Sequence, residues 1–134
     1  MSLEPTLHRD AYLTPGAFAR EREAIFTREW MCVGREEEIP GAGDYLLLDV
    51  AGESLLLVRD REGVIRAHYN VCRHRGSQLV LGVDPRPRAG TSGPSGSFTS
   101  GIRCPYHAWT YNLDGTLRTA QRIRYEVKAN WKVI

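Results

Sequence analysis

The chain has 134 residues, of which 42% are hydrophobic and 25% are charged, and its formal net charge is +2. Such a chain can bury one core of ordinary size, and its charge is too small to indicate a nucleic-acid-binding protein. No apolar run approaches the length of a transmembrane helix, and the first residues lack the apolar centre of a secretion signal. We therefore expect a cytoplasmic protein of modest size, with neither nucleic acid nor a membrane as its partner.

The N-terminal region predicts a helix followed by a short strand. Thr14 can cap a first turn that begins at Pro15, and apolar residues then recur at near-helical spacing up to about Trp30. Residues 31–34 predict a strand, on which Cys32 would be a small buried hydrophobic residue. We take residues 1–35 as an N-terminal helix and lead-in.

Residues 36–124 predict a mainly β domain. Two apolar runs meet at Ala51-Gly52, a pair suited to a hairpin turn, and Asp60 to Gly63 has the composition of another turn. Strands are expected over residues 44–50, 53–59, 64–70, 97–103 and 109–112 and from residue 116 onward. This succession of short strands and turns favours antiparallel pairing.

Two short segments each combine one cysteine with one histidine. They are Cys72-Arg73-His74 and Cys104-Pro105-Tyr106-His107, and 29 residues separate His74 from Cys104. Each segment lies between predicted strands, so both can sit at the tips of adjacent hairpins and converge. Two thiolates on one iron and two imidazoles on the other are the ligand set of a Rieske [2Fe–2S] cluster. The pattern therefore indicates electron transfer at an intermediate reduction potential.

Two other interpretations use the same residues. A structural zinc module also takes two cysteines and two histidines, but zinc sites usually pair Cys with Cys and His with His on each arm. A disulfide between Cys72 and Cys104 would leave both histidines unexplained, and nothing near the N-terminus indicates an oxidising compartment. The zinc module stays open as the remote alternative.

The residues around both segments extend the pattern. Residues 69–76 read YNVCRHRG and residues 104–115 read CPYHAWTYNLDG. They resemble the cluster loops in the large (alpha) subunit of Rieske non-haem iron ring-hydroxylating oxygenases. Further similar residues are Ile25-Phe26, Trp30, Val33-Gly34, Pro40-Gly41, Gly43-Asp44-Tyr45 and Val58-Arg59-Asp60. The resemblance thus covers nearly the whole chain.

The resemblance implies a fold, a cofactor and a role. The fold would be an antiparallel β-sandwich with two cluster-binding hairpin loops, preceded by the N-terminal helix. Cys72 and Cys104 would bind the buried iron, and His74 and His107 the outer iron. The domain would relay single electrons from a reductase or ferredoxin to a mononuclear Fe(II) in a catalytic domain of its own or a neighbouring subunit, within a homo-oligomer. A free-standing Rieske ferredoxin is the alternative, but small carriers do not need the long helical lead-in.

Three positions distinguish branches of the Rieske group. Respiratory Rieske proteins have extra cysteines at the positions of Ser77 and Tyr106, and a serine at the position of Trp109. That serine donates a hydrogen bond to cluster sulfur, which raises the reduction potential. Because Trp109 cannot do so, we expect a potential in the low part of the Rieske range of about −150 to +300 mV.

Charged and glycine residues beside the predicted ligands are expected to adjust the site. Arg73, Arg75 and Arg103 would stabilise the negative charge gained on reduction, unless they are solvated or paired with carboxylates. Gly76 would supply a backbone conformation that other residues resist.

The aromatic neighbours and the remaining histidines have separate expected roles. Tyr106 would shield the site or donate its hydroxyl, whereas Trp109 would pack beneath the loop without touching the cluster. His8 and His68 have no partner at metal-ligand spacing, and His68 is expected to be an ordinary strand residue.

Three features depart from the family pattern: an insertion, a short junction and a missing iron-ligand motif. Residues 82–101 are rich in Gly, Pro and Ser and predict a flexible surface insertion. Residues 125–134 resemble the beginning of the family's catalytic domain, and residues 121–124 connect them almost directly to the preceding strand. The chain shows no motif for the iron site of two histidines and one carboxylate that activates oxygen. We therefore expect one part of a larger oxidoreductase, with its oxygen chemistry elsewhere.

Overall fold

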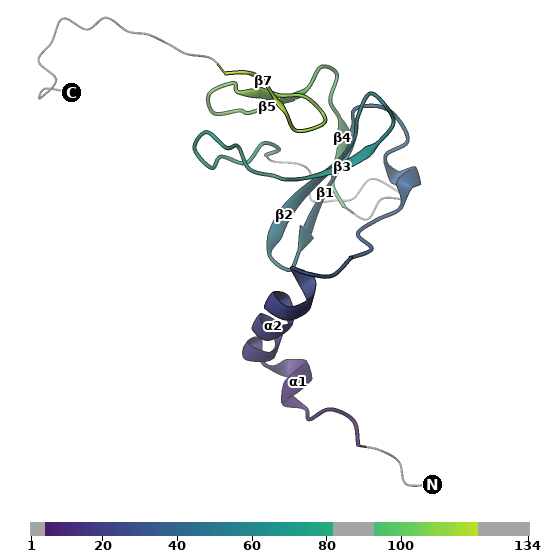
Figure 1. Ribbon diagram of the computed structural model, residues 1–134, viewed down its shortest axis with the longest axis vertical. Helices are drawn as coiled ribbons and strands as arrows, with labels where there is room; N and C mark the ends of the chain where they lie inside the picture. The colour runs from purple at the N-terminus through teal and green to yellow at the C-terminus, as the bar shows by residue number, and fades with distance from the viewer. Residues whose placement is uncertain (1–4, 82–92, 121–134) are drawn as a thin grey trace, which may run out of the picture.

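Two antiparallel sheets form the body of the protein (Figure 1), which confirms the predicted mainly β class. The structure is a computed structural model that describes residues 5–81 and 93–120. Its helices are α1 (Asp10–Leu13), α2 (Pro15–Glu21), the π-helix η1 (Arg22–Phe26) and the 3₁₀-helix η2 (Glu36–Glu38). Its strands are β1 (Asp44–Val50), β2 (Glu53–Arg59), β3 (Ile65–Tyr69), β4 (Ser95–Ser97), β5 (Ile102–Arg103), β6 (Thr110–Tyr111) and β7 (Leu117–Thr119). One sheet has the order β3-β2-β1-β4 and the other β5-β6-β7.

The hairpin of β1 and β2 forms where the sequence predicts it. Ala51 and Gly52 have φ angles of 54° and 87°, the positive values that a type I′ hairpin turn requires. Successive side chains of β2 point to opposite faces of the sheet, as in any strand. Leu56 and Val58 therefore enter one core, and Leu57 enters another.

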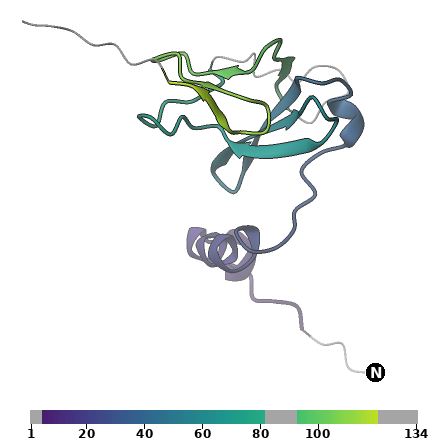
Figure 2. The ribbon, with the colours of Figure 1, turned by 45° about the horizontal axis from the view of Figure 1, so that its top comes forward.

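The main core lies between the two sheets, where the three-stranded sheet covers β3 in Figure 2. A hydrogen-bond contact of 3.0 Å between His68 Nε2 and the carbonyl oxygen of Leu113 joins the two sheets directly. The buried members of this core are Leu56, Val58, Cys72, Val80, Ile102, Cys104, Tyr111 and Leu113. Two of them are the cysteines of the predicted cluster site, so the site is built into the core of the domain.

The predicted N-terminal helix is present and begins as expected. The hydroxyl oxygen of Thr14 accepts a hydrogen bond from the N–H of Ala17 at 3.3 Å, and Pro15 opens α2. The helix continues through η1 and ends at Phe26, a few residues before the predicted end near Trp30. It lies beside the turn between β1 and β2 and projects away from the sheets (Figure 1).

The strand predicted over residues 31–34 is wrong. These residues have no regular secondary structure, and the edges of the four-stranded sheet are β3 and β4. Without a neighbouring strand, an extended segment cannot satisfy its backbone groups by sheet pairing. Cys32 is consequently exposed, against the expectation that it is buried, and Trp30 is fully exposed as well.

The flexible insertion predicted over residues 82–101 is wrong for its second half. Ser95–Ser97 forms β4 and pairs with β1, and the N–H of Leu47 donates to the carbonyl oxygen of Pro94 at 2.8 Å. Small residues are needed here for close packing, because a Cβ on Gly96 would lie 2.6 Å from the hydroxyl of Tyr45. The predicted strand over residues 97–103 is correspondingly reduced to β5. Residues 82–92 and the predicted segments after residue 120 lie outside the described residues.

Candidate functional site

The cysteine-histidine segments form two loops, here called the first arm (residues 72–77) and the second arm (residues 104–109). In the first arm, the N–H of Cys72 donates to the carbonyl oxygen of Ser77 at 2.7 Å, and the N–H of Gly76 donates to that of Cys72 at 2.9 Å. The second arm repeats this pattern: Cys104 donates to Trp109 at 2.8 Å, and Ala108 donates to Cys104 at 3.1 Å. Each cysteine therefore begins its own loop, and the two loops have the same pattern of backbone hydrogen bonds.

A residue with positive φ completes each turn at the same position. Gly76 has a φ of 70° in the first arm and Ala108 has a φ of 57° in the second. The prediction that Gly76 supplies an unusual backbone conformation is confirmed. Alanine rarely adopts such an angle, so the second arm keeps its shape against a local backbone preference.

The two cysteines lie side by side in the core. Cys72 is 2% exposed and Cys104 is 3% exposed, and no disulfide joins them. Burial raises the pKa of the Cys104 thiol, but hydrogen bonds from the backbone N–H groups of Tyr106 and His107 and from the side chains of Cys72 and Ser77 outweigh it. The pKa of Cys104 is therefore below its ordinary value, which favours the thiolate that binds metal.

The two histidines lie together, nearer the surface. The ring centroids of His74 and His107 are 5.0 Å apart, and the rings meet at 64°. His74 is exposed and His107 is half-buried. Nδ1 of His107 is buried and has no hydrogen-bond partner in the described residues. A buried ring nitrogen without a partner is costly, and a metal bond would satisfy it.

The four donors are arranged in two pairs, thiol with thiol and imidazole with imidazole. In residues 5–81 and 93–120, no three His, Cys, Asp or Glu side chains are grouped so that they could hold one metal ion. Each iron of a [2Fe–2S] cluster needs only two protein ligands, because bridging sulfides supply the others. The pairing of thiol with thiol and imidazole with imidazole fits that requirement.

Two of the predicted neighbours are aromatic residues that contact the histidines. The ring of Trp109 stacks on that of His74, with centroids 4.7 Å apart and an angle of 2° between the planes. Trp109 thus contacts a predicted ligand of the other arm, a contact that the expectation of packing beneath the loop did not include. Tyr106 is 58% exposed, and its ring lies 3.8 Å from that of His107, which is compatible with a shielding role.

The charged neighbours and the remaining histidines are not among the buried residues of the two arms. Arg73, Arg75 and Arg103 are exposed. His8 is exposed beside Asp10, and His68 is a residue of β3, as predicted.

Tyr111 is a site residue that the sequence reasoning missed. Its hydroxyl lies 3.2 Å from Sγ of Cys72 and accepts a hydrogen bond from the N–H of Arg73 at 3.2 Å. Burial, with the hydrogen bond to Cys72, raises the pKa of Tyr111 to about 12. The sequence held one signal for this role: side chains two positions apart in a strand share a face, so Tyr111 is expected on the same face as Trp109.

Ser77 is the second missed residue. It closes the turn of the first arm, and its hydroxyl donates to the carbonyl oxygen of Gln78 at 3.2 Å. Its side chain nevertheless lies close enough to Cys104 of the second arm to lower the pKa of that thiol. Trp109 does the reverse, since it closes the second arm and stacks on His74 of the first. The two arms are thus connected by crossed contacts that their separate motifs do not show.

The chain is similar to known Rieske proteins. A family model for the Rieske [2Fe–2S] domain matches residues 29–128. The carnitine monooxygenase oxygenase subunit of Escherichia coli is 42% identical over 110 residues, which make up 82% of this chain and 26% of that protein. Biphenyl 2,3-dioxygenase subunit alpha of Rhodococcus jostii is 36% identical over 115 residues, 86% of this chain and 22% of that protein. The chain thus spans about a quarter of the length of these relatives.

Solved structures of Rieske monooxygenases are also similar to this chain. The apo form of the quaternary ammonium Rieske monooxygenase CntA matches with a TM-score of 0.73 and 38% identity, over 87% of this chain and 30% of that one. Another structure of a quaternary ammonium Rieske monooxygenase, also 38% identical, is described as giving insight into inter-subunit electron transfer. In the part of the chain that the structure describes, no helix is long and apolar enough to cross a bilayer. With the family match over most of its length and the paired donors on its two arms, the chain belongs to the Rieske [2Fe–2S] domain family.

Proposed function

We propose that the two arms hold the [2Fe–2S] cluster, with Cys72 and Cys104 on the inner iron and His74 and His107 on the outer iron. The assignment rests on one observation: the two thiols lie deeper in the protein than the two imidazoles. Both thiols are buried and in contact, whereas the imidazoles lie together nearer the surface. The unpartnered Nδ1 of His107 supports the same assignment.

A Rieske cluster supplies one-electron transfer when it is bound. The residues of this chain would hold it in a fixed orientation. The buried Cys72 and Cys104 would hold it from the core, and the exposed His74 would hold it on the side open to a redox partner. Tyr111 would donate a hydrogen bond to the sulfur of Cys72, which stabilises the more negative, reduced state. Ser77 would favour the thiolate form of Cys104, whose pKa it lowers. Trp109 would keep the imidazole of His74 in place.

The chain would act as the electron relay of an oxygenase subunit. Its relatives are oxygenase subunits of which it spans about a quarter, and one of them is described in terms of electron transfer between subunits. We infer that this domain accepts single electrons from a reductase or ferredoxin. It would pass them to a mononuclear iron in a catalytic domain of its own or a neighbouring subunit of a homo-oligomer. The cytoplasm, where thiols stay reduced, is the compartment we propose for it.

Anaerobic reconstitution of the full chain with iron and sulfide tests the assignment. We expect equal amounts of iron and sulfide to bind. After reduction, the rhombic electron paramagnetic resonance (EPR) signal should have an average g-value below that of all-cysteine clusters. A colourless protein that binds one zinc ion instead would establish the zinc module and overturn the proposal.

A further inference from the structure

The two arms are closed in different ways where they join the rest of the domain. The second arm lies between β5 and β6, which are paired antiparallel strands. The first arm follows β3, whose partner is β2 and not the segment after the arm. That segment, residues 78–81, belongs to no strand in the part of the chain that the structure describes. Pairing between strands therefore closes the second arm but not the first.

The buried side chain of Asn70 takes the place of this pairing. Asn70 directly follows β3 and is 3% exposed. Its Oδ1 accepts hydrogen bonds from the N–H of Leu79 at 3.1 Å and from the N–H of Val80 at 2.8 Å. Its Nδ2 donates to the carbonyl oxygen of Val80 at 3.1 Å and to the hydroxyl oxygen of Ser54 at 3.3 Å. The amide thus bonds both the N–H and the C=O of Val80, as a residue on a neighbouring antiparallel strand would.

The hydrogen-bonding capacity of the Asn70 amide is fully used. A primary amide has two N–H donors and one oxygen with two lone pairs, and each of these four positions has a partner. Val80 is 8% exposed and belongs to the same core as Cys72. Buried backbone groups that lose a partner cost more than exposed ones, so an apolar residue at position 70 would release the segment after the arm.

We propose that Asn70 is a positioning residue that closes the first arm and thereby holds Cys72 and His74 in place for the cluster. This inference rests on the proposed function and adds to it the device that positions one of the two arms. Two contacts enclose the arm. The inner one joins the N–H of Cys72 to the carbonyl oxygen of Ser77 and shapes the turn. The outer one joins Asn70 to Val80 and fixes the turn to the core.

Limited proteolysis of the full chain with trypsin tests whether Asn70 holds the first arm. Arg73 and Arg75 are exposed in that arm, so trypsin can cut after either residue when the arm opens. In Asn70→Ala, cleavage at these two sites should be about tenfold faster, because the buried hydrogen bonds that keep the arm closed are lost. Cleavage after Arg103, which lies in β5, should change less than about twofold. Mass spectrometry of the peptides gives the rate at each site.

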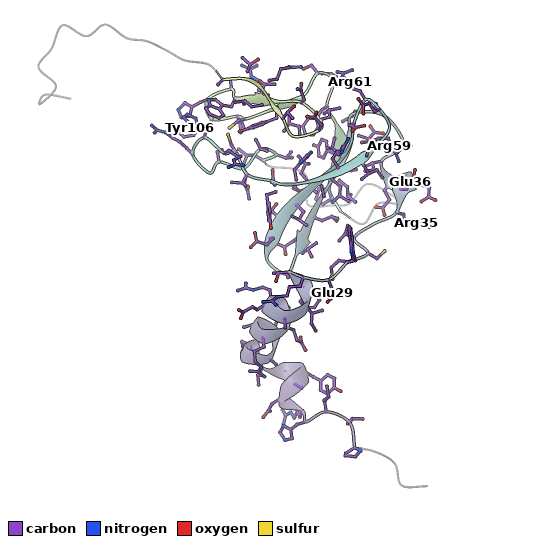
Figure 3. The ribbon with its side chains drawn as sticks, in the orientation of Figure 1. Glu29, Arg35, Glu36, Arg59, Arg61 and Tyr106 are labelled. Atoms are coloured by element: carbon purple, nitrogen blue, oxygen red, sulfur yellow. The ribbon has the colours of Figure 1, made fainter. Side chains whose placement is uncertain are left out.

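Asp60→Ala is the matched control, because Asp60 is another buried side chain that closes a turn. Asp60 is 4% exposed, and its carboxylate accepts hydrogen bonds from the N–H groups of Glu62 and Val64. Figure 3 labels its neighbour Arg61 on the side of the domain opposite Tyr106 of the second arm. The control should lower the stability of the domain and accelerate cleavage after Arg61, but not within the first arm.

Pulsed EPR of the reconstituted, reduced variants gives a readout that a general loss of stability would not produce. In Asn70→Ala, the coupling of one histidine nitrogen should weaken or broaden, because His74 is no longer held. The coupling from His107 should stay as in the unchanged protein. Asp60→Ala should keep both couplings. Changes that are the same in both variants would contradict a specific role for Asn70.

Hydrogen exchange of the unchanged protein tests the same contacts without a variant, should Asn70→Ala fail to fold. The N–H groups of Leu79 and Val80 lie outside any helix or strand. They should nevertheless exchange about a hundredfold more slowly than the N–H of the exposed Gln78. Equally fast exchange at all three positions would overturn the inference, as would equal cleavage of the first arm in Asn70→Ala and Asp60→Ala.

Failure of the proposed function has a different signature. An unchanged protein without the Rieske EPR signal would refute the cluster assignment, and the proteolysis and exchange results would still show whether Asn70 closes the arm. A normal signal together with an unaltered first arm in Asn70→Ala would refute the role of Asn70 alone.

Discussion

The first and second arms have the same backbone turn but different side chains around it. In each arm a cysteine N–H donates to the residue five positions later, and a residue with positive φ donates back to the cysteine. The histidine, however, follows the cysteine by two positions in the first arm and by three in the second. His74 is consequently exposed, whereas His107 is half-buried with an unpartnered Nδ1.

The difference teaches that the backbone positions the cysteines, whereas contacts between the arms position the rest. Each turn is closed by a residue whose side chain serves the other arm: Ser77 contacts Cys104, and Trp109 stacks on His74. Tyr111 adds a third contact, to Cys72. Neither arm alone would hold its side chains in this arrangement.

Removal of either buried cysteine should have the largest effect. Because both arms place their cysteine by the same turn, Cys72→Ser and Cys104→Ser should be equally severe. Each should lower the amount of bound iron substantially. The loss should exceed the roughly 10–100-fold loss of metal affinity that follows when a residue that only supports a ligand is changed. Iron and sulfide analysis after reconstitution measures it. Cys32→Ser is the matched control, since Cys32 is exposed and outside the arms. If one arm variant kept a normal cluster, the assignment of the inner iron would be wrong.

Trp109→Leu tests the crossed contact to the histidine side. Loss of the ring that stacks on His74 should free this imidazole and accelerate cluster loss by about tenfold. The decay of visible absorption in air gives the rate. Trp30→Leu removes a tryptophan that is fully exposed and should leave the rate unchanged. Equal decay in both variants would refute the idea that the second arm holds the first.

Tyr111→Phe should lower the reduction potential. The hydroxyl that faces Sγ of Cys72 stabilises the reduced state, and one hydrogen bond is worth about 0.5–1.5 kcal/mol, or roughly 20–65 mV for one electron. A spectroscopic redox titration measures the midpoint. The control is Tyr106→Phe, which removes the hydroxyl of a tyrosine on the second arm that is 58% exposed. A larger shift in the control than in Tyr111→Phe would reverse the roles assigned to the two tyrosines.

Gly76→Ala should destabilise the fold by about 1 kcal/mol through its positive φ alone. A Cβ at Gly76 would meet nothing within 4 Å, so no steric clash adds to the cost. Gly63, with a φ of 83° and equally open surroundings, provides a matched site outside the arms. Urea unfolding of the two alanine variants should therefore give similar losses. A much larger loss at Gly76 would show that the arm requires glycine for a reason other than backbone conformation.

The smallest effect is expected away from the arms, at Asp60. Burial raises the pKa of this carboxyl, but hydrogen bonds from Arg66, Val64 and Glu62 hold it below its ordinary value of 3.8. A lowered native pKa stabilises the fold above the unfolded pKa, and this contribution disappears as the pH falls through the native value. Thermal unfolding from pH 6 to about pH 3 should therefore show a weaker acid dependence in Asp60→Asn. An unchanged acid dependence would exclude Asp60 as its source.

The sequence predicted the features that depend on neighbours along the chain. Thr14 and Pro15 start the helix, Ala51-Gly52 turns the hairpin, and the two cysteine-histidine motifs lie in loops, because each of these depends on local backbone chemistry. The features it missed depend on residues distant in the sequence. Residues 31–34 could form a strand only beside a partner strand. Position 96 requires glycine because the ring of Tyr45 lies against it. Tyr111 becomes a site residue only when its sheet packs over Cys72.

The most direct test of the account is a pulsed EPR measurement of the reduced, reconstituted protein with its histidines labelled with ¹⁵N. The account predicts couplings from two histidine nitrogens, one of which disappears in His74→Cys and the other in His107→Cys. A reduced cluster with no histidine coupling, or with couplings that both variants leave unchanged, would contradict the assignment of the outer iron to the two arms.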